Sequence, residues 1–269
     1  MSTPPAPLIS VALLARDEVT HLPACLASLA ALAAPPQGEI IVVLDSRAPA
    51  ALEVIARQAT PHVSRSAFVN FSAQRNRALA ACRGTWVFFV DPDERATPAL
   101  VAELTTLLAG APPIGGAWVP RRNFMFGHEV RHGGWAPDYQ LRLLRRAGAC
   151  YDEARAVHEV PVVAGETIYL HEPLLHYNYA TWGQFVAKQR AYSAHEAAAL
   201  AAAGRRARPR NFVLQPLREF RRRWLTLGGR HDGRLGLLLA LAMAYYTLRT
   251  YALLARGGRR TGTAPPPAL

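Results

Sequence analysis

The stretch WVFFVDPDER, residues 86–95, joins an apolar run directly to three carboxylates, at Asp91, Asp93 and Glu94. An apolar run without alternation is expected of a strand buried on both faces, as the strands of parallel sheets are. In open α/β sheets, ligands bind beyond the carboxyl ends of the strands. The stretch therefore predicts a buried strand with an acidic site at its end.

The residues before this stretch alternate between strand-like and helix-like segments. Residues 8–14 and 39–45 are apolar runs of the same kind, and residues 62–66 are a candidate short strand. Such alternation predicts an α/β fold with a mostly parallel, Rossmann-like sheet and helices on both faces. The second run ends in Asp45, so Asp45 and Asp91 are expected on the same edge of the sheet.

Segments with helix signals separate these strands. The pattern of alternating strands and helices ends near residue 115. Short strand-like pieces alternate with glycine-rich turns up to about residue 180, and the chain is helical and alanine-rich from Thr181. The expected N-terminal helices cover residues 22–32, 49–59, 71–84 with Ser72 as N-cap and Gly84 at the end, and 97–110 with Thr97 as N-cap and Pro98 at the first position.

Charge is unevenly distributed along the 269 residues. The net charge is +12, yet residues 1–204 carry 17 basic and 17 acidic side chains, whereas residues 205–269 carry 14 basic and 2 acidic ones. This pattern predicts that the C-terminal part meets an anionic partner. The three cysteines form no CxxC pair and the N-terminal residues do not resemble a signal peptide, which together favour a cytoplasmic protein.

Two aspartates one residue apart form a hard-oxygen pair. Such a pair binds Mg²⁺ or Mn²⁺ weakly, and substrate phosphates complete the coordination. The ion can then neutralise charge that develops on a phosphate leaving group. The alternative is that Asp91, Asp93 and Glu94 cap the helix that begins near Thr97.

Several motifs occur in order between residues 8 and 159: LISVALLARDE, EIIVVLDS, FSAQRNRALAACRGTWVFFVDPDE, PRRNFMFG, RHGGWAPDYQLRLLRR and VHE. Taken together, they resemble family 2 glycosyltransferases, in particular bacterial lipopolysaccharide-core and related envelope-glycan enzymes, and the resemblance runs from about residue 8 to 255. The resemblance implies a GT-A fold, a nucleotide-sugar donor, a divalent metal and inversion at the anomeric carbon.

The same resemblance assigns regions and residues. It implies a donor-binding half at 1–114 and an acceptor and catalytic half at 115–180 of the same domain. Composition predicts a helical, membrane-associating extension at 181–256 and a disordered tail at 257–269. Arg75 and Asn76 would lie beside the donor, although a solvated helix face is the alternative for Arg75. The other implied roles are nucleotide binding by Ala15, Arg16 and Asp17, contact with the base or ribose by Asp45, donor and metal binding by Asp91, and metal binding by Asp93, the stronger ligand candidate.

The chain departs from the family pattern after its second strand. Where family members commonly read DSGSTD, residues 45–50 read DSRAPA, so Ala50 replaces the second aspartate and Arg47 the flexible glycine. This departure puts the donor base and sugar in doubt, and Arg47 is expected to add a phosphate contact.

Inverting transfer requires a general base that accepts the proton of the acceptor hydroxyl. The resemblance favours Glu159 in VHE, with Asp138 as the second candidate, and the alternative for both is an ion pair with nearby arginines. His158 would ligate the metal or orient Glu159. His128 and His132 are not expected to bind zinc, because the glycines around them argue against a helix.

The C-terminal part has the composition of a membrane-surface segment. The apolar run at 235–248 has 14 residues, fewer than the roughly 20 that span a bilayer, so it is expected to lie in the interface or pack on the body. Arginines flank Phe220, Trp224 and Leu225. We expect residues 205–256 to bind an anionic membrane surface at the inner face of the cytoplasmic membrane. A helical hairpin with an arginine-coated face is the alternative.

These observations predict an inverting glycosyltransferase that acts on a glycolipid or lipid-linked glycan in lipopolysaccharide-core or exopolysaccharide synthesis. The alternatives are a nucleotidyltransferase and a non-catalytic basic protein that binds nucleic acid or membranes. A degenerate, non-catalytic relative of the family is a further alternative, because Ala50 replaces the usual second aspartate. A nucleic-acid partner is not expected, because the body is neutral and carries no recognisable nucleic-acid module.

Overall fold

The computed structural model describes residues 6–154 and 160–257, which form two compact units. The first unit holds the described residues up to Arg121 together with Asp138–His176. The second holds Arg122–Pro137 and the described residues from Tyr177 onward.

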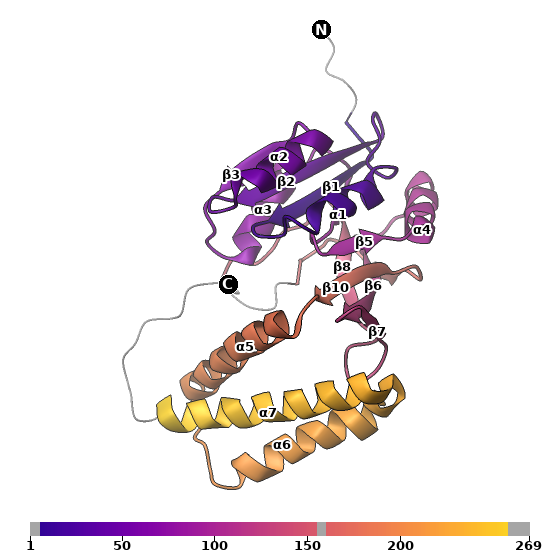
Figure 1. Ribbon diagram of the computed structural model, residues 1–269. Helices are drawn as coiled ribbons and strands as arrows, with labels where there is room; N and C mark the ends of the chain where they lie inside the picture. Colours follow the sequence, from indigo (N-terminus) through magenta and orange to yellow (C-terminus); the bar gives the residue numbers. More distant parts are fainter. Residues whose placement is uncertain (1–5, 155–159, 258–269) are drawn as a thin grey trace. The chain divides into compact units, whose positions relative to one another are not determined.

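Four parallel strands form the first part of the sheet, in the order β3-β2-β1-β4, and Figure 1 labels the first three. Every residue of β2 and β4 is buried, as the apolar runs predict. One core cluster joins α1, α2 and α4 to one face of these strands, and a second joins α3 to the other face. The elements are β1 (Ile9–Ala15), α1 (Leu22–Leu29), β2 (Gly38–Asp45), α2 (Ala50–Ala59), β3 (Val63–Ser66), α3 (Phe71–Ala81), β4 (Trp86–Phe89), β5 (Glu94–Ala96) and α4 (Pro98–Ala109).

The sheet continues from β4 in antiparallel strands. β8 (Tyr139–Arg145) pairs antiparallel with β4 and with β6 (Gly116–Met125). The register shifts between Ala117, opposite Leu143, and Trp118, opposite Leu141. Arg142 is therefore the extra residue of a β-bulge, a device that re-aims a side chain. The remaining strands are β7 (His128–Val130) and β9 (Thr167–Tyr169), which pair with β6, and β10 (Leu174–Tyr179), which pairs with β5.

The structure confirms the predicted α/β class, with a parallel first half and a β-rich second half, and it confirms Thr97 as the N-cap of α4. The Thr97 side chain accepts a hydrogen bond from the backbone N–H of Leu100. The predicted first residue of α3, Phe71, is confirmed, whereas its predicted cap, Ser72, and its predicted end, Gly84, were wrong. Asn70 is its N-cap, because its side chain accepts from Ala73 N, and the helix ends at Ala81 rather than at Gly84.

The second unit is mainly helical. α5 (Trp182–Ala202) begins with a capping box formed by Thr181 and Gln184. α6 (Asn211–Arg221) continues through a π-helical turn, and it lies beside α7 (Gly233–Gly257) in Figure 1. Within the described residues, the segment Gly229–Gly257 is long and apolar enough to cross a membrane by length and composition, with a third of its most apolar window buried. The predicted tail at 257–269 lies outside the described residues, apart from Gly257.

Candidate active site

The two aspartates of the DPDE motif have different surroundings. Asp91 lies between two arginines: its Oδ1 accepts from Arg75 Nη2 at 3.3 Å and its Oδ2 accepts from Arg142 Nη2. Burial opposes ionisation of Asp91, but the charges of Arg142 and Arg75 outweigh it and hold the pKa of Asp91 well below its usual range. Both of its carboxylate oxygens are engaged by cations of the protein itself.

Glu94 is fully buried and holds the turn from Asp91 to Glu94 in place. Its Oε2 accepts from the backbone N–H of Asp91 at 2.8 Å, and its Oε1 accepts from Arg142 at 2.7 Å and Arg121 at 3.2 Å. The carboxylates therefore do not cap α4, whose N-cap is Thr97. That alternative is wrong, and the third carboxylate of the motif is a structural anchor for the first.

Arg142 is the buried cation of this network. Burial alone would lower the pKa of Arg142, but the charges of Asp91 and Glu94 raise it above its ordinary value. Its Nε is buried without a hydrogen-bond partner among the described residues. The bulge delivers this guanidinium between two carboxylates, and removing it would leave buried charge uncompensated.

Asp138, the second candidate base, is held in an ion pair. Its Oδ2 accepts from Arg121 Nε at 2.9 Å, and its Oδ1 accepts from Gln140 Nε2 at 2.9 Å. Arg121 thus links Asp138 to Glu94. Both carboxylate oxygens of Asp138 are therefore engaged by donors of the protein itself.

Asp93 lies near a histidine that the sequence analysis did not identify. The distance from Asp93 Oδ2 to His176 Nε2, on β10, is 3.6 Å. Within residues 6–154 and 160–257, no group of three histidine, cysteine or acidic side chains is placed to hold a metal. The Asp93 carboxylate suits Mn²⁺ or Mg²⁺ in a site that substrate phosphates complete, and an imidazole nitrogen beside it favours Mn²⁺, a transition metal, over Mg²⁺. The residues present fit such an ion at Asp93 and His176 better than at Asp91.

The helix residues Arg75 and Asn76 are both engaged. The Arg75 guanidinium lies over the rings of Phe89 and Tyr151, at 5.2 and 5.7 Å from their centroids, and its side chain is only 15% exposed. The solvated-face alternative for Arg75 is therefore wrong. Asn76 donates to the backbone oxygen of Tyr151 at 2.9 Å and accepts from its backbone nitrogen at 2.8 Å, and so ties α3 to the segment before residue 155.

The predicted nucleotide-binding residues lie at the ends of β1 and β2. Ala15 ends β1, and the Arg16 and Asp17 side chains pair at 3.1 Å. Asp45 ends β2 and accepts from Arg47, whose hydrogen bond lowers the pKa of Asp45 to about 2. Asp45 is thus the last residue of β2, and Asp91 lies two residues beyond the end of β4. Glu159 and His158, the preferred base and the third metal candidate, lie outside the described residues.

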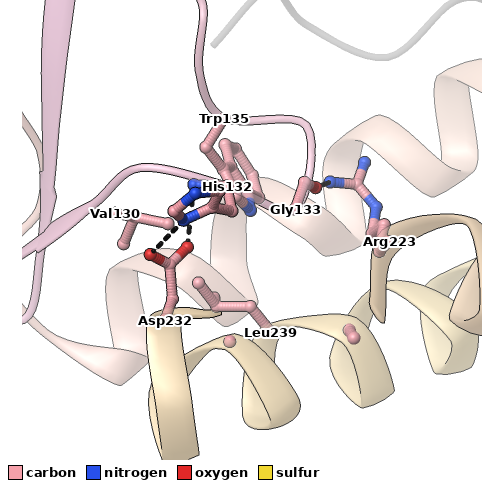
Figure 2. A pocket seen from close by; sticks show the side chains of 9 residues that line it. Val130, His132, Gly133, Trp135, Arg223, Asp232 and Leu239 are labelled. Carbon is pink, nitrogen blue, oxygen red and sulfur yellow. Dashed lines mark hydrogen bonds and ion pairs between the residues drawn. The ribbon is translucent and has the colours of Figure 1, made fainter. Parts of the chain in front are cut away.

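The second unit contains a separate polar cluster, shown in Figure 2. Asp232 accepts from the backbone N–H of His132 at 2.8 Å and lies 3.0 Å from His132 Nδ1. Arg223 donates to the Gly133 carbonyl at 2.8 Å and stacks over Trp135, at 5.2 Å from its centroid. Arg223 is therefore a structural residue that fastens the 132–135 loop, not a surface charge as its sequence context suggests.

The outer faces of α6 and α7 expose apolar side chains among arginines. α7 buries Leu239, Tyr246 and Leu254 on one side and exposes a stripe on the opposite side. Exposed arginines accompany this surface. The exposed apolar residues are Val213, Leu214 and Leu217 on α6, Leu225 after it, and Leu237, Leu238, Leu241 and Tyr245 on α7.

Comparison with known proteins gives consistent matches. A family model described as glycosyl transferase family 2 matches residues 10–156. The lipopolysaccharide core biosynthesis glycosyltransferase LpsC of Rhizobium meliloti (strain 1021) is 30% identical over 183 residues, which is 68% of each chain.

Solved structures also match, with low structural scores. TarS residues 1–349 of S. aureus, in complex with UDP-GlcNAc, is 18% identical with a TM-score of 0.40, covering 52% of this chain and 45% of TarS. Glucosyl-3-phosphoglycerate synthase of Mycobacterium tuberculosis, with Mg²⁺ and UDP, is 16% identical with a TM-score of 0.42, covering 63% of this chain and 71% of that one. This chain thus spans less than half of TarS.

Proposed function

Because this chain belongs to glycosyl transferase family 2, we propose that it transfers a sugar from a nucleotide-sugar donor to a hydroxyl of a glycolipid or lipid-linked glycan. The observation that carries the proposal is the acidic edge of the parallel sheet. Asp45 ends β2, and Asp91 and Asp93 follow β4, which is where open α/β sheets bind their ligands. Glu94, the third carboxylate of the motif, holds this edge in place by accepting a hydrogen bond from Arg142.

Donor binding is assigned to this edge. The nucleoside lies against the β1 end and Asp45, with Arg75 and Asp91 beside it. Arg47 already pairs with Asp45 at 2.9 Å, so a nucleoside that reaches Asp45 shares that carboxylate with Arg47. Asp93 and His176 would hold Mg²⁺ or Mn²⁺, and His158 remains a further candidate ligand. When bound, the ion would neutralise the negative charge on the departing nucleoside diphosphate.

The chain's own residues supply the proton acceptor. Glu159 takes the proton from the acceptor hydroxyl, the hydroxyl oxygen forms the new bond at the anomeric carbon, and the bond to the nucleoside diphosphate breaks, with inversion. The contacts of Asp138 with Arg121 and Gln140 count against Asp138 as the proton acceptor, because these donors already engage both of its carboxylate oxygens.

The acceptor lies at a membrane. Residues 205–256 bind an anionic lipid surface, because this segment combines exposed apolar side chains on α6 and α7 with most of the chain's excess positive charge. Such a surface places a cytoplasmic enzyme beside a lipid-linked substrate in lipopolysaccharide-core or exopolysaccharide synthesis.

A donor screen tests the proposal. Purified full-length protein is incubated with Mn²⁺ or Mg²⁺ and a panel of UDP-, GDP-, ADP- and dTDP-sugars, and nucleoside diphosphate release is measured. We expect metal-dependent release from at least one donor, and loss of release in Asp93→Ala. Glu53→Ala, which removes a surface acid paired with Arg57 and Arg65, is the control and should retain activity. Pyrophosphate release from nucleoside triphosphates without sugar transfer would identify a nucleotidyltransferase instead.

A further inference from the structure

Three aromatic rings of the first unit, two exposed tyrosines and the half-buried Trp118, form a cluster that donor binding does not use. Trp118 and Tyr169 are nearly parallel, with ring centroids 5.9 Å apart and an interplanar angle of 15°. Tyr139 meets Tyr169 edge to face at 5.1 Å. Tyr169 is 60% exposed and Tyr139 is 38% exposed, although burying such rings is favourable. We call these three rings the aromatic ledge.

Strand pairing places the ledge on one side of the sheet. Trp118 on β6 is the register partner of Tyr169 on β9, and Pro120 is the partner of Tyr139 on β8. Trp118 Nε1 donates to Thr167 Oγ1 at 3.2 Å, which satisfies the polar atom of the indole. The rings therefore present apolar faces with the tyrosine hydroxyl groups beside them.

The ledge is continuous with the acidic edge on the side away from the nucleotide residues. Tyr139 directly follows Asp138, and Arg121, next to Pro120, pairs with both Asp138 and Glu94. In the sheet order β2-β1-β4-β8-β6, the ledge strands lie on one side of β4 and Asp45 at the end of β2 lies on the other. A ligand on the ledge thus approaches the site from the side opposite the nucleoside.

We propose that the aromatic ledge binds a sugar ring of the acceptor glycan. This inference rests on the proposed function, and it assigns the acceptor subsite of the same enzyme. A pyranose ring has a C–H face that stacks on an aromatic ring and a rim of hydroxyl groups that hydrogen-bond. The ledge offers both kinds of contact: two nearly parallel rings, and phenol groups at their border.

The test measures glycan binding and turnover separately. The probe is a deacylated lipopolysaccharide-core oligosaccharide, titrated against the full-length protein without donor, and in parallel used as acceptor at saturating donor. Trp118→Ala and Tyr169→Ala should each raise the Kd and the acceptor KM about five- to tenfold, the scale of one stacked ring. The kcat at saturating acceptor and the donor hydrolysis rate should stay within twofold of wild type.

Two further variants separate stacking from other causes. Tyr169→Phe keeps the ring and should retain most of the affinity. Tyr192→Ala removes a ring of similar exposure, 56%, on α5, and should bind the oligosaccharide as wild type does. Unchanged Kd and KM in both alanine variants would overturn the inference, as would a matching loss of UDP affinity, which would make the ledge a nucleotide site. If the wild-type protein released no nucleotide, only the proposed function would be contradicted. The titration without donor would still show whether the aromatic ledge binds the oligosaccharide.

Discussion

The acidic edge and the C-terminal helices both depend on arginine, in opposite ways. At the edge, Arg142 is buried and lies between Asp91 and Glu94, and Arg121 joins Glu94 to Asp138. On α6 and the turn that follows it, Arg218, Arg221 and Arg222 are exposed, and Arg222 pairs with Glu219 of the preceding turn. A buried guanidinium stabilises the fold through ion pairs of one fixed geometry. Exposed guanidinium groups form weak individual pairs, and they attract an anionic surface through their total charge.

The comparison teaches that position rather than composition assigns the function of an arginine. Arg223 stands in the run Arg221–Arg223, yet it packs on Trp135 and bonds to Gly133. It belongs with the buried group. A test of membrane binding that neutralises Arg221–Arg223 together would therefore also loosen the 132–135 loop, so we use Arg210, Arg218 and Arg221 instead.

The largest expected effect is on stability. Arg142→Met leaves Asp91 and Glu94 with one fewer buried cation and should lower the free energy of unfolding by about 3 kcal/mol. Arg222→Met, which breaks an exposed pair with Glu219, should cost less than about 1 kcal/mol. Urea unfolding of both variants measures the two values. Equal losses would remove the distinction between the two groups of arginines.

The next effect is on turnover. Glu159→Gln should leave donor affinity near wild type and lower turnover by roughly 10², the scale of lost general-base catalysis. Asp138→Asn should have the smaller effect on turnover, since Arg121 already holds that carboxylate. Steady-state kinetics at saturating donor decide between them. A severe defect in Asp138→Asn beside an active Glu159→Gln would reverse the assignment.

Membrane binding should show an effect that is smaller for each residue and adds up over the three residues replaced. Replacing Arg210, Arg218 and Arg221 by glutamine should weaken binding to anionic vesicles by about 1 kcal/mol per residue at low salt. The difference from wild type should shrink as salt rises, because exposed charges are screened. Vesicle co-sedimentation measures it, and hydrolysis of the soluble donor should not change. Equal binding of wild type and triple variant to anionic vesicles would instead favour the arginine-coated helical hairpin.

The smallest effect concerns acid stability. The folded-state pKa of Asp45 is about 2, below its ordinary value of 3.8, because of Arg47. The pair therefore stabilises the fold above about pH 4, and this contribution is lost as the pH falls toward 2. Arg47→Ala should lower Tm at pH 6, and the gap to wild type should close toward pH 2. A gap that is the same at both pH values would exclude this linkage.

The sequence predicts the parallel half of the fold well. The buried runs of β1, β2 and β4 and the cap at Thr97 are local patterns, and the structure confirms them. The family resemblance is confirmed too. The N-cap of α3 was missed because Asn70 and Ser72 are both good N-caps, and tertiary packing buries Ser72 inside the first turn.

The site was predictable only where its residues follow a strand directly. Asp45, Asp91 and Asp93 have such a signal, and their binding roles stay predictions. His176 has none, because its distance to Asp93 depends on how β10 pairs with β5. The position of Arg142 depends on a bulge, which is a register irregularity between β6 and β8 that no periodicity reveals. Both are consequences of tertiary pairing.

The central claim is that the two aspartates of one motif have different functions: Asp93 holds the metal with His176, and Asp91 is neutralised by arginines. Mn²⁺ binding in the presence of UDP, followed by the electron paramagnetic resonance signal of free Mn²⁺, tests it directly. Asp93→Ala and His176→Ala should lose binding, whereas Asp91→Asn, if folded by circular dichroism, should retain it within a few-fold. Loss of Mn²⁺ binding in folded Asp91→Asn, with binding retained in His176→Ala, would contradict the account.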